Sequence, residues 1–380
     1  MSTAPGSEIL INEVESKRVV TLNRPRALNA LNLSMIRKFY SSLKVVLNNI
    51  LDVFEPVSLP KWNNEGSVSL ILLKGNGGKA FCAGGDVIAV TNSATAKDKL
   101  STVHKDFFHD EYLLNHLIGV CSIPFVSIID GITMGGGCGL SMHGAFQVAT
   151  EKTVVAMPET ALGLFPDVGG SYFLSRLKNK LGVFMALTGY RLQGADVYHA
   201  GLCTHYVKSS VLPTLENELM EIKDEEVKPQ VIRAKLEKYS ENDLPKFTLA
   251  SHLEEIKTIF GASTMESIIE NLRKSNTEFA QKQLRTLSKK SPTSLKVTLK
   301  QILEGEKMTF DDVFTMEYRL SQRFTSGHDF HEGCRAILIE KDHKPNWVPA
   351  KLEDVTDEMI NKYFEPLGKE DLMINTKTHS

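Results

Sequence analysis

Two glycine-rich turns, each directly after a run of β-branched and aliphatic residues, constrain the fold of this 380-residue chain most strongly. The first turn, "GKAFCAGGDV" (78–87), follows the run "SVSLILLKG" (67–75). The second, "GITMGGGCGLSMHG" (131–144), follows "PFVSIIDG" (124–131). Such runs are typical of strands, and glycine lets the following backbone approach another group closely. Each turn is therefore expected to join a strand to a helix.

Further strands and a long helix are expected in the same half of the chain. "RVVTLN" (18–23), "FQVAT" (146–150) and "VVAM" (154–157) have the composition of strands. "NLSMIRKFYSSLKVVLNNIL" (32–51) has apolar residues at near-helical spacing and begins with capping residues such as Asn32. Repeated strand–strand–helix units indicate an α/β fold with buried sheets.

The character of the sequence changes after about residue 208, which divides the chain into an α/β core (8–208) and an α-helical C-terminal region (209–380). The charged residues of this second region are expected to form solvated helix faces. "LDVFEPVSLPKWNNEG" (51–66) is expected to be a surface loop within the core. Seven amphipathic helices are predicted in the C-terminal region: 211–222, 228–240, 251–261, 264–275, 277–290, 291–306 and 309–324.

Composition argues against several classes of function. The 44 basic and 46 acidic residues give a net charge of −2, which disfavours binding of nucleic acid through a strongly basic surface. No apolar run approaches the ~20 residues that a membrane span needs. The odd number of cysteines and the lack of metal-ligand spacing predict free thiols and no metal site. The cysteines are Cys82, Cys121, Cys138, Cys203 and Cys334.

The chain ends give no targeting signal. The opening residues include Glu8, Glu13 and Glu15 and lack a hydrophobic core, so they resemble neither a secretory signal nor an acid-poor transit peptide. The C-terminal "KTHS" is not the S-K-L peroxisomal signal.

The two glycine turns together predict a carbonyl-binding site. N–H groups at a helix N-terminus lack intrahelical partners. One such N–H from each turn can converge on a single oxygen and stabilise negative charge there, as an oxyanion hole does. Either turn alone is also compatible with phosphate binding or with a purely structural role. Neither matches G-x-G-x-x-G or G-x-x-x-x-G-K-[ST], which disfavours a nucleotide site.

Two acids lie in the unusual stretch "AMPETALGLFPDVGGSYF" (156–173), which is apolar and interrupted by Gly and Pro. This composition suits packed irregular backbone better than a solvated loop or an amphipathic helix. It therefore predicts that Glu159 and Asp167 are enclosed. An enclosed carboxylate is either hydrogen-bonded within the structure or used chemically, and the residues alone leave both interpretations open.

The chain resembles the crotonase superfamily. The resemblance is carried by "NRPRALNAL" (23–31), "KAFCAGGD" (79–86), the second glycine turn and "MPETALGLFPDVGGSYFLSRL" (157–177), in this order. It extends over most of the chain, through segments such as "FHEGCRAILIEKD" (330–342). It implies a crotonase-like spiral of ββα units with an α-helical C-terminal region, and a CoA thioester as substrate.

The resemblance also implies roles for individual residues. The N–H groups of Gly85 and Gly136 correspond to the oxyanion hole, and Glu159 and Asp167 correspond to the catalytic acids. Glu111, in a helix between the two turns, corresponds to a substrate-binding residue expected to accept a hydrogen bond from a 3-hydroxyl group. Glu159 is expected either to attack the thioester carbonyl or to activate water, with Asp167 orienting Glu159 or the water.

Within the superfamily, the resemblance favours hydrolysis. Hydratases carry two glutamates, and the first of these positions is here Gly139, which cannot transfer a proton. The expected reaction is hydrolysis of 3-hydroxyisobutyryl-CoA to 3-hydroxyisobutyrate and CoA in valine breakdown. It needs no metal and no cofactor beyond the CoA of the substrate. An enoyl-CoA isomerase or hydratase and a non-catalytic binding protein of the same fold are the alternatives.

The resemblance has further implications outside the acids. The valine pathway points to mitochondria, and superfamily cores often form homo-oligomers. Relatives often have a basic residue for the CoA phosphates where this chain has Ile88, and Lys74, Lys79 or a residue of the helical region is expected to replace it.

Four other polar residues near the turns are expected to be structural. His143 is expected to be packed or capping, and Cys82 and Cys138 to be small packed side chains. Asp86 is expected to fix its turn through backbone N–H groups.

Overall fold

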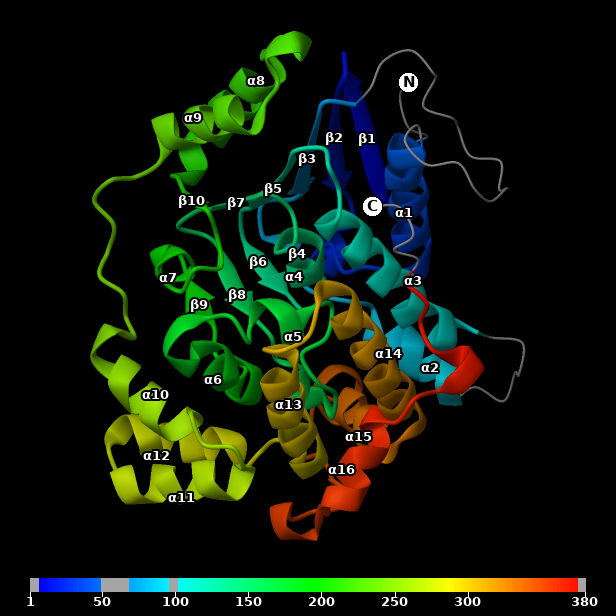
Figure 1. Ribbon diagram of the computed structural model, residues 1–380, viewed down its shortest axis with the longest axis vertical. Coiled ribbons are helices and arrows are strands. Elements are labelled where there is room, and N and C mark those ends of the chain that lie inside the picture. The colour runs from blue at the N-terminus through cyan, green and yellow to red at the C-terminus, as the bar shows by residue number, and fades with distance from the viewer. Residues whose placement is uncertain (1–6, 49–67, 96–101, 375–380) are drawn as a thin grey trace.

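The computed structural model describes residues 7–48, 68–95 and 102–374, and two sheets lie at its centre (Figure 1). A six-stranded sheet has the order β1-β2-β3-β5-β7-β10 and a four-stranded sheet the order β4-β6-β8-β9. The larger sheet consists of β1 (Ile9–Val14), β2 (Lys17–Leu22), β3 (Leu70–Gly75), β5 (Phe125–Ile129), β7 (Phe146–Ala149) and β10 (His205–Tyr206). The smaller consists of β4 (Ala80–Cys82), β6 (Ile132–Met134), β8 (Val154–Ala156) and β9 (Leu192–Gln193).

Successive strand pairs divide between the two sheets. The pairs β3/β4, β5/β6 and β7/β8 each contribute their first strand to the larger sheet and their second to the smaller one. From β2 to β10 the strands of the larger sheet are parallel, and only β1 is antiparallel to its neighbour. Helices follow the pairs, which confirms the predicted spiral of ββα units. These helices are α1 (Leu33–Asn48), α2 (Val87–Thr95), α3 (Val103–Gly119), α4 (Gly136–Ser141), α5 (Gly170–Phe173), α6 (Leu181–Thr188) and α7 (Ala195–His199).

The larger sheet is buried on both faces, which explains its nearly continuous apolar strands. In β3, Ile71 and Leu73 belong to the main hydrophobic cluster, whereas Leu70 and Leu72 belong to a second cluster on the opposite face. Helices α8 (Leu212–Met220) and α9 (Pro229–Tyr239) supply the other half of this second cluster. Although they follow residue 208 in sequence, these two helices therefore cover the sheet.

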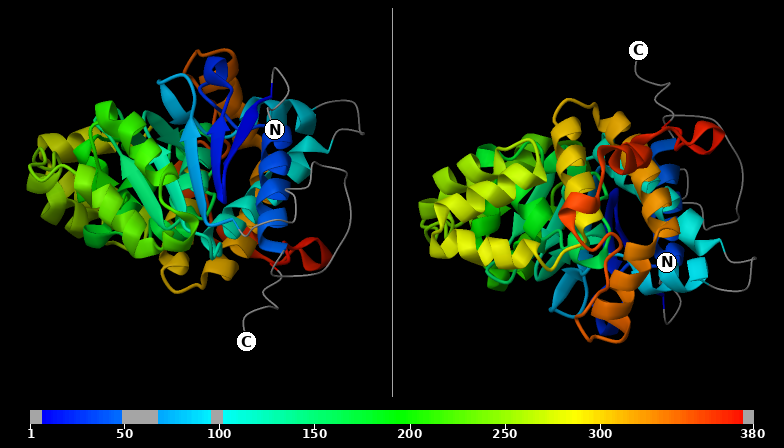
Figure 2. Two further views of the ribbon diagram at one scale, coloured as in Figure 1. Left: turned by 90° about the horizontal axis from the view of Figure 1, so that it is seen from above. Right: turned by 90° about the horizontal axis from the view of Figure 1, so that it is seen from below.

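The remaining helices of the C-terminal region share the main hydrophobic cluster with the core. Seen from below, the helices coloured yellow to red lie over the core strands (Figure 2). Helix α14 packs against α3 and α5, and α15 packs against the 3₁₀ turn Glu159–Leu162. These helices are α10 (Leu253–Phe260), α11 (Met265–Ser275), α12 (Glu278–Leu287), α13 (Pro292–Gly305), α14 (Phe310–Ser326), α15 (His328–Cys334) and α16 (Asp357–Phe364). The domain boundary at residue 208 stays a prediction.

The expected elements are confirmed where the sequence signal is long. All five expected strands and all seven expected C-terminal helices are present, and Asn32 Oδ1 caps α1 by accepting the Met35 N–H at 2.8 Å. The analysis missed β1 and the strands β4, β6, β9 and β10, of which the last four have only two or three residues. The expected loop at 51–66 lies outside the described residues. Among the described residues, no helix is long and apolar enough to cross a membrane.

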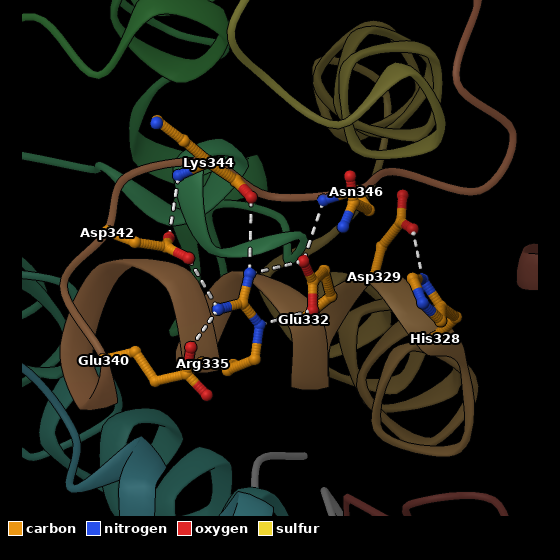
Figure 3. A network of polar contacts seen from close by, with 8 residues as sticks. All are labelled: His328, Asp329, Glu332, Arg335, Glu340, Asp342, Lys344 and Asn346. Carbon is orange, nitrogen blue, oxygen red and sulfur yellow. Dashed lines mark hydrogen bonds and ion pairs between the residues drawn. The ribbon is translucent and has the colours of Figure 1, made fainter.

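A network of charged residues fastens the segment after α15 to that helix (Figure 3). The Arg335 guanidinium binds both oxygens of Glu332 at 2.8 Å, and Nη1 also contacts Glu340 at 2.5 Å and Asp342 at 2.8 Å. Glu332 in turn accepts the Asn346 N–H at 2.8 Å. A bidentate guanidinium contact of this kind fixes orientation as well as charge, so the segment folds back onto α15.

We predict that Ser291→Ala lowers the free energy of unfolding by about 2–4 kcal/mol, because two hydrogen bonds are lost from one buried hydroxyl. Ser291 Oγ caps α13 by accepting the Ser294 N–H at 3.0 Å and donates to Asp329 Oδ2 at 2.6 Å. Thr309→Ala is the control. Thr309 Oγ1 also caps a helix, α14, but this residue is exposed to solvent, so loss of its hydroxyl should lower the free energy of unfolding by only about 1 kcal/mol. Denaturant unfolding measures both, and equal losses would refute the prediction.

Candidate active site

Helix α3 carries polar side chains on its buried face. Phe107, Glu111 and Asn115 are spaced by four residues and therefore project from one face of the helix. Glu111 is 2% exposed and Asn115 is 0% exposed. Glu111 Oε1 and both amide atoms of Asn115 have no hydrogen-bond partner within the described residues. Buried polar atoms are rarely left unpaired, so this face of α3 is where a ligand or ordered water is expected to provide partners.

The two glycine-rich turns meet beside this face of α3. A Cβ atom built on Gly136 would lie 3.4 Å from the backbone nitrogen of Gly85 and 2.4 Å from Glu111 Oε1. Gly136 is the first residue of α4, where an N–H has no intrahelical acceptor. In the described part of the chain, the Gly85 N–H also has no acceptor. The two N–H donors predicted from the sequence are therefore neighbours and are available to a ligand.

Glu159 lies beside the second glycine turn. A Cβ atom built on Gly135 would lie 2.8 Å from Glu159 Oε1. Glu159 is 6% exposed, and its Oε2 has no hydrogen-bond partner among the described residues. One carboxylate oxygen is thus held against the turn that carries Gly136, and the other is available for chemistry.

Helix α15 packs closely against the 3₁₀ turn that carries Glu159, and two glycines allow this close contact. A Cβ atom on Gly163 would lie 2.1 Å from the carbonyl oxygen of Asp329, and one on Gly333 would lie 2.3 Å from the carbonyl carbon of Leu162. Only glycine allows backbone to meet backbone so closely. The turn is therefore backed by a helix of the C-terminal region, which is the helix to which the Arg335 network connects the following segment (Figure 3).

Asp167 is tied to α3 through Tyr112. The Tyr112 hydroxyl donates a 2.9 Å hydrogen bond to Asp167 Oδ2, and both side chains are buried. Tyr112 follows Glu111 in the chain, so a single helix positions two of the three acids. The structure thus brings together all five residues predicted for the site, which are Gly85, Glu111, Gly136, Glu159 and Asp167, while their roles stay predictions.

Burial raises the pKa of all three carboxyl groups, and Asp167 raises the pKa of both glutamates further. Burial raises the pKa of Glu111 well above its usual value, and the charges of Asp167 and Glu159 add to the effect. Burial and then Asp167 raise the pKa of Glu159 well above its usual value. Burial also raises the pKa of Asp167 to about 7, although the Tyr112 hydroxyl opposes this. Because adjacent buried carboxylates cannot all ionise together, the cluster holds a proton near neutral pH.

Gly139 has no room for a side chain. A Cβ atom there would lie 2.6 Å from Val168 Cβ and 2.8 Å from both amide atoms of Asn115. Contacts this short are essentially absent between real Cβ atoms and their neighbours. A second acid at this position would therefore displace Asn115 and the residue after Asp167.

The structural roles expected for nearby residues are confirmed. His143 packs against Phe310 and Phe314, with ring centroids 5.2 and 5.7 Å away. Cys82 and Cys138 are buried free thiols, and burial raises the pKa of Cys82 to about 12.

Two other predictions concern the first turn and the CoA phosphates. Asp86 Oδ1 accepts the Ala89 N–H at 3.4 Å, as expected for a residue that fixes its turn. Lys74, one of the candidates for the CoA phosphates, forms an ion pair with Glu216 of α8.

Sequence analysis missed three polar residues of the site. Tyr112 and Asn115 lie one and four residues after Glu111, so the helical spacing alone contained a signal for Asn115. Glu317 of α14 was assigned with its neighbours to a solvated face, and this is wrong, because it is 0% exposed. Glu317 lies four residues after Val313 and three before Leu320, so the helical spacing contained a signal for its burial, as it did for Asn115.

Comparison with known families places this site in context. Residues 17–364 match the family model described as enoyl-CoA hydratase/isomerase. The chain belongs to this family. Solved structures agree with that assignment: a carnitinyl-CoA dehydratase from Mycobacterium thermoresistibile aligns with a TM-score of 0.85 at 34% identity, covering 98% of this chain and all of that one (100%). An enoyl-CoA hydratase from Rhodobacter sphaeroides aligns with a TM-score of 0.83 at 31% identity, covering 97% and 100%.

Curated relatives are more similar in sequence. The human protein named "3-hydroxyisobutyryl-CoA hydrolase, mitochondrial" is 50% identical over 374 residues, which is 97% of this chain and 92% of that protein. The zebrafish (Danio rerio) protein of the same name is 48% identical over 378 residues, which is 98% of this chain and 94% of that protein. Across the described residues, no group of three or more His, Cys, Asp or Glu side chains is placed to hold a metal ion.

We predict that Asp167→Asn stabilises the fold at pH 8 by about 2–4 kcal/mol and that this gain disappears near pH 4. The pKa of Asp167 is raised from 3.8 to about 7 by burial. Between these values the unfolded chain loses the proton first, so wild-type stability is full at low pH and falls as the pH rises through 7. The amide introduced by Asp167→Asn does not ionise, so the stability of this variant does not fall in the same way.

Denaturant unfolding at pH 4, 6 and 8 measures this effect. Tyr112→Phe is the companion variant, because removing the donor raises the pKa of Asp167 further and extends the decline in stability to higher pH. The same stability difference between Asp167→Asn and wild type at all three pH values would show that Asp167 does not titrate in this range.

Proposed function

We propose that this chain is an acyl-CoA thioesterase that hydrolyses 3-hydroxyisobutyryl-CoA to 3-hydroxyisobutyrate and CoA. The names of relatives that are 48–50% identical over almost the whole chain support this substrate. One geometric observation supports this chemistry. The Gly85 nitrogen lies 3.4 Å from the position of a Cβ atom built on Gly136, and the Glu111 and Glu159 carboxylates lie beside the same glycine turn. Such an arrangement suits a thioester carbonyl that becomes an oxyanion during the reaction.

The reaction begins when the thioester oxygen accepts hydrogen bonds from the Gly85 and Gly136 N–H groups. Glu159 then either attacks the carbonyl carbon, forming a mixed anhydride and releasing the CoA thiolate, or removes a proton from a water that attacks it. In the first route water hydrolyses the anhydride and restores Glu159. Both routes consume one water and yield one carboxylic acid and one thiol.

Asp167 and Glu111 complete the proposed assignment. Asp167 orients Glu159 or the attacking water and transfers a proton toward the leaving thiolate, a role that suits a group whose burial raises its pKa to about 7. Glu111 accepts a hydrogen bond from the 3-hydroxyl group, and its Oε1 is buried without a partner in the described residues. A buried acceptor left unpaired by an unsubstituted acyl group disfavours that substrate.

The crowding at Gly139 supports hydrolysis over hydration. Adding water across a double bond requires one group to activate water and another to protonate carbon. A side chain at 139 would lie 2.6 Å from Val168 Cβ, so the turn that carries Asp167 occupies the space of a second acid. The enoyl-CoA isomerase and the non-catalytic binding protein stay as alternatives without a specific observation in their favour.

The same relatives and site residues also support proposals for the location, cofactors and partners of the protein. We propose a mitochondrial location, as the relatives' names state for them. The reaction as proposed needs an acyl-CoA substrate but no metal, no separate cofactor, no membrane and no nucleic acid. A homo-oligomer is compatible with these roles, because every residue that they use comes from one chain.

We predict that Glu159→Gln lowers the rate of CoA release from 3-hydroxyisobutyryl-CoA by about 10²–10⁴-fold, as expected for loss of a nucleophile or general base. Thiol trapping measures the released CoA. Glu278→Gln, on the exposed surface of α12, is the control and should retain wild-type activity. Undiminished release in Glu159→Gln would remove Glu159 from the mechanism. Hydration of crotonyl-CoA by the wild type, without release of thiol, would favour the alternative enzyme class.

We predict that Glu111→Leu lowers kcat/KM for 3-hydroxyisobutyryl-CoA by about 10–100-fold, because the buried hydrogen bond to the hydroxyl is lost. Isobutyryl-CoA has no hydroxyl group, so its slower hydrolysis should change little. The ratio of the two kcat/KM values is the measurement. Equal losses on both substrates would show that Glu111 does not recognise the hydroxyl.

A further inference from the structure

The turn after Asp167 has a backbone conformation that its residues do not favour. Val168 has φ 54° and Gly169 has φ 82°, so two consecutive residues are left-handed. Glycine adopts this region freely, but a β-branched residue such as valine is strained there. A strained turn persists only when its surroundings hold it in place. The contacts around residues 166–171 therefore decide where the Asp167 carboxylate lies.

Glu317 of α14 makes the strongest of these contacts. Its Oε2 accepts the Gly169 N–H at 2.7 Å, while Oε1 accepts the Ser171 N–H at 2.8 Å and the Ser171 hydroxyl at 2.6 Å. Left-handed Gly169 is followed by Gly170, the first residue of α5. A left-handed residue next to a right-handed one aims successive N–H groups toward one side and forms a concave anion site. The Glu317 carboxylate, which is 0% exposed, occupies this concavity.

The hydrogen-bond directions around Glu317 can be assigned completely. Gln301 Nε2 donates to the Pro166 carbonyl at 2.5 Å and to Ser171 Oγ at 2.8 Å. Ser171 Oγ accepts there and donates its own proton to Glu317 Oε1 at 2.6 Å. Glu317 therefore faces three donors, which favour the ionised form, although burial raises its pKa to about 8. The three donors oppose this rise, because an N–H cannot accept a proton from a neutral carboxyl group.

A third side chain secures the strained residue itself. His143 Nε2 lies 2.7 Å from the Val168 carbonyl oxygen. A carbonyl oxygen only accepts, so Nε2 carries the proton, and burial lowers the pKa of His143 to about 4, which keeps the ring neutral. His143, Gln301 and Glu317 thus bind the turn at Val168, Pro166 and Gly169.

We propose that Glu317 is a positioning residue of the active site, which holds the strained turn at Val168 and Gly169 in the conformation that directs Asp167 toward Tyr112 and the other acids. The inference rests on the proposed function, because Asp167 must take part in hydrolysis for its position to affect the rate. Glu317 does not contact Glu159, Glu111 or the N–H groups of the oxyanion hole among the contacts of the described residues. Besides holding the turn, the Glu317 charge raises the pKa of Glu159 and of Tyr112.

The test begins with Glu317→Gln in the full-length protein. An amide keeps the size of the side chain but places an NH₂ group against one of the two backbone N–H groups, so the carboxylate cradle is broken. We expect kcat for CoA release to fall by about 10–100-fold with little change in KM, because a displacement of about 1 Å at a catalytic group has an effect of this size. Glu317→Asp keeps the charge and should retain an intermediate kcat.

Asp196→Ala is the matched control. Asp196 is a buried carboxylate of α7 that accepts the Thr248 N–H at 3.0 Å and so also links the core to a later segment of the chain. Its removal should reduce stability without changing kcat. An equal fall of kcat in both variants would indicate a general loss of structure and would overturn the proposal.

A double-mutant cycle with Asp167→Asn separates positioning from an independent effect. If Glu317 acts through Asp167, adding Glu317→Gln to Asp167→Asn lowers kcat little further. Additive losses, or a folded Glu317→Gln with wild-type kcat, would overturn the proposal. Should Glu317→Gln fail to fold, Ser171→Ala removes one of the three donors to Glu317, together with the acceptor of one Gln301 hydrogen bond, and must show a smaller kcat loss that is again non-additive with Asp167→Asn. Wild-type kcat in Ser171→Ala would then overturn it.

Amide hydrogen exchange provides a readout that does not depend on the reaction. Exchange at Gly169 and Ser171 should be faster in Glu317→Gln than in wild type and unchanged in Asp196→Ala. If the wild-type protein released no CoA at all, the proposed function would fail. The exchange result would still show whether Glu317 holds the turn, and unchanged exchange in Glu317→Gln would refute that.

Discussion

Three carboxyl groups buried in one place without a paired cation are the constraint on which the rest of this structure depends. Glu111, Glu159 and Asp167 are each at most 6% exposed, and none forms an ion pair within the described residues. Desolvation and mutual repulsion oppose this arrangement. It is maintained because the groups come from separate, firmly packed elements: Glu111 from α3, Glu159 from a 3₁₀ turn, and Asp167 from a strained turn.

The C-terminal helices provide the support for two of these elements. Helix α15 meets the Glu159 turn at Gly163 and Gly333, and α14 holds the Asp167 turn through Glu317. A spiral of ββα units alone contains no atoms at these positions, since both supporting helices lie beyond residue 300. The helical region is therefore part of the architecture of the site as well as of the hydrophobic core. This agrees with the main apolar cluster, which contains residues from both regions.

The sequence predicts those parts of the site that depend on residue type and local backbone. Glycine allows close approach of the two turns, and the apolar, Pro-interrupted sequence predicts enclosed acids, whereas the individual site residues were identified through the resemblance to the crotonase superfamily. Tyr112 was not identified, because a tyrosine on a helix is usually a core residue. Glu317 was misassigned, because its burial results from contact with a turn about 150 residues earlier in the chain. The contact itself leaves no local signal, although the helical spacing of Glu317 from Val313 and Leu320 places it on the buried face of α14. The short strands β4, β6, β9 and β10 escaped detection for the related reason that two or three residues show no alternation.

The distribution of unpaired polar atoms indicates that the site is organised for a ligand before one arrives. Glu111 Oε1, Glu159 Oε2 and both amide atoms of Asn115 are buried without partners, whereas every oxygen of Glu317 is satisfied by a donor. Both sets are buried to a similar degree, so burial alone does not explain the difference. A supporting residue can be paired within the protein, but a group that must bind substrate or water cannot be paired in advance without losing that capacity. Preorganised donors and acceptors of this type stabilise the transition state without rearrangement during the reaction. Because the acids are buried to this end, the free energy of unfolding decreases as the pH rises and they ionise.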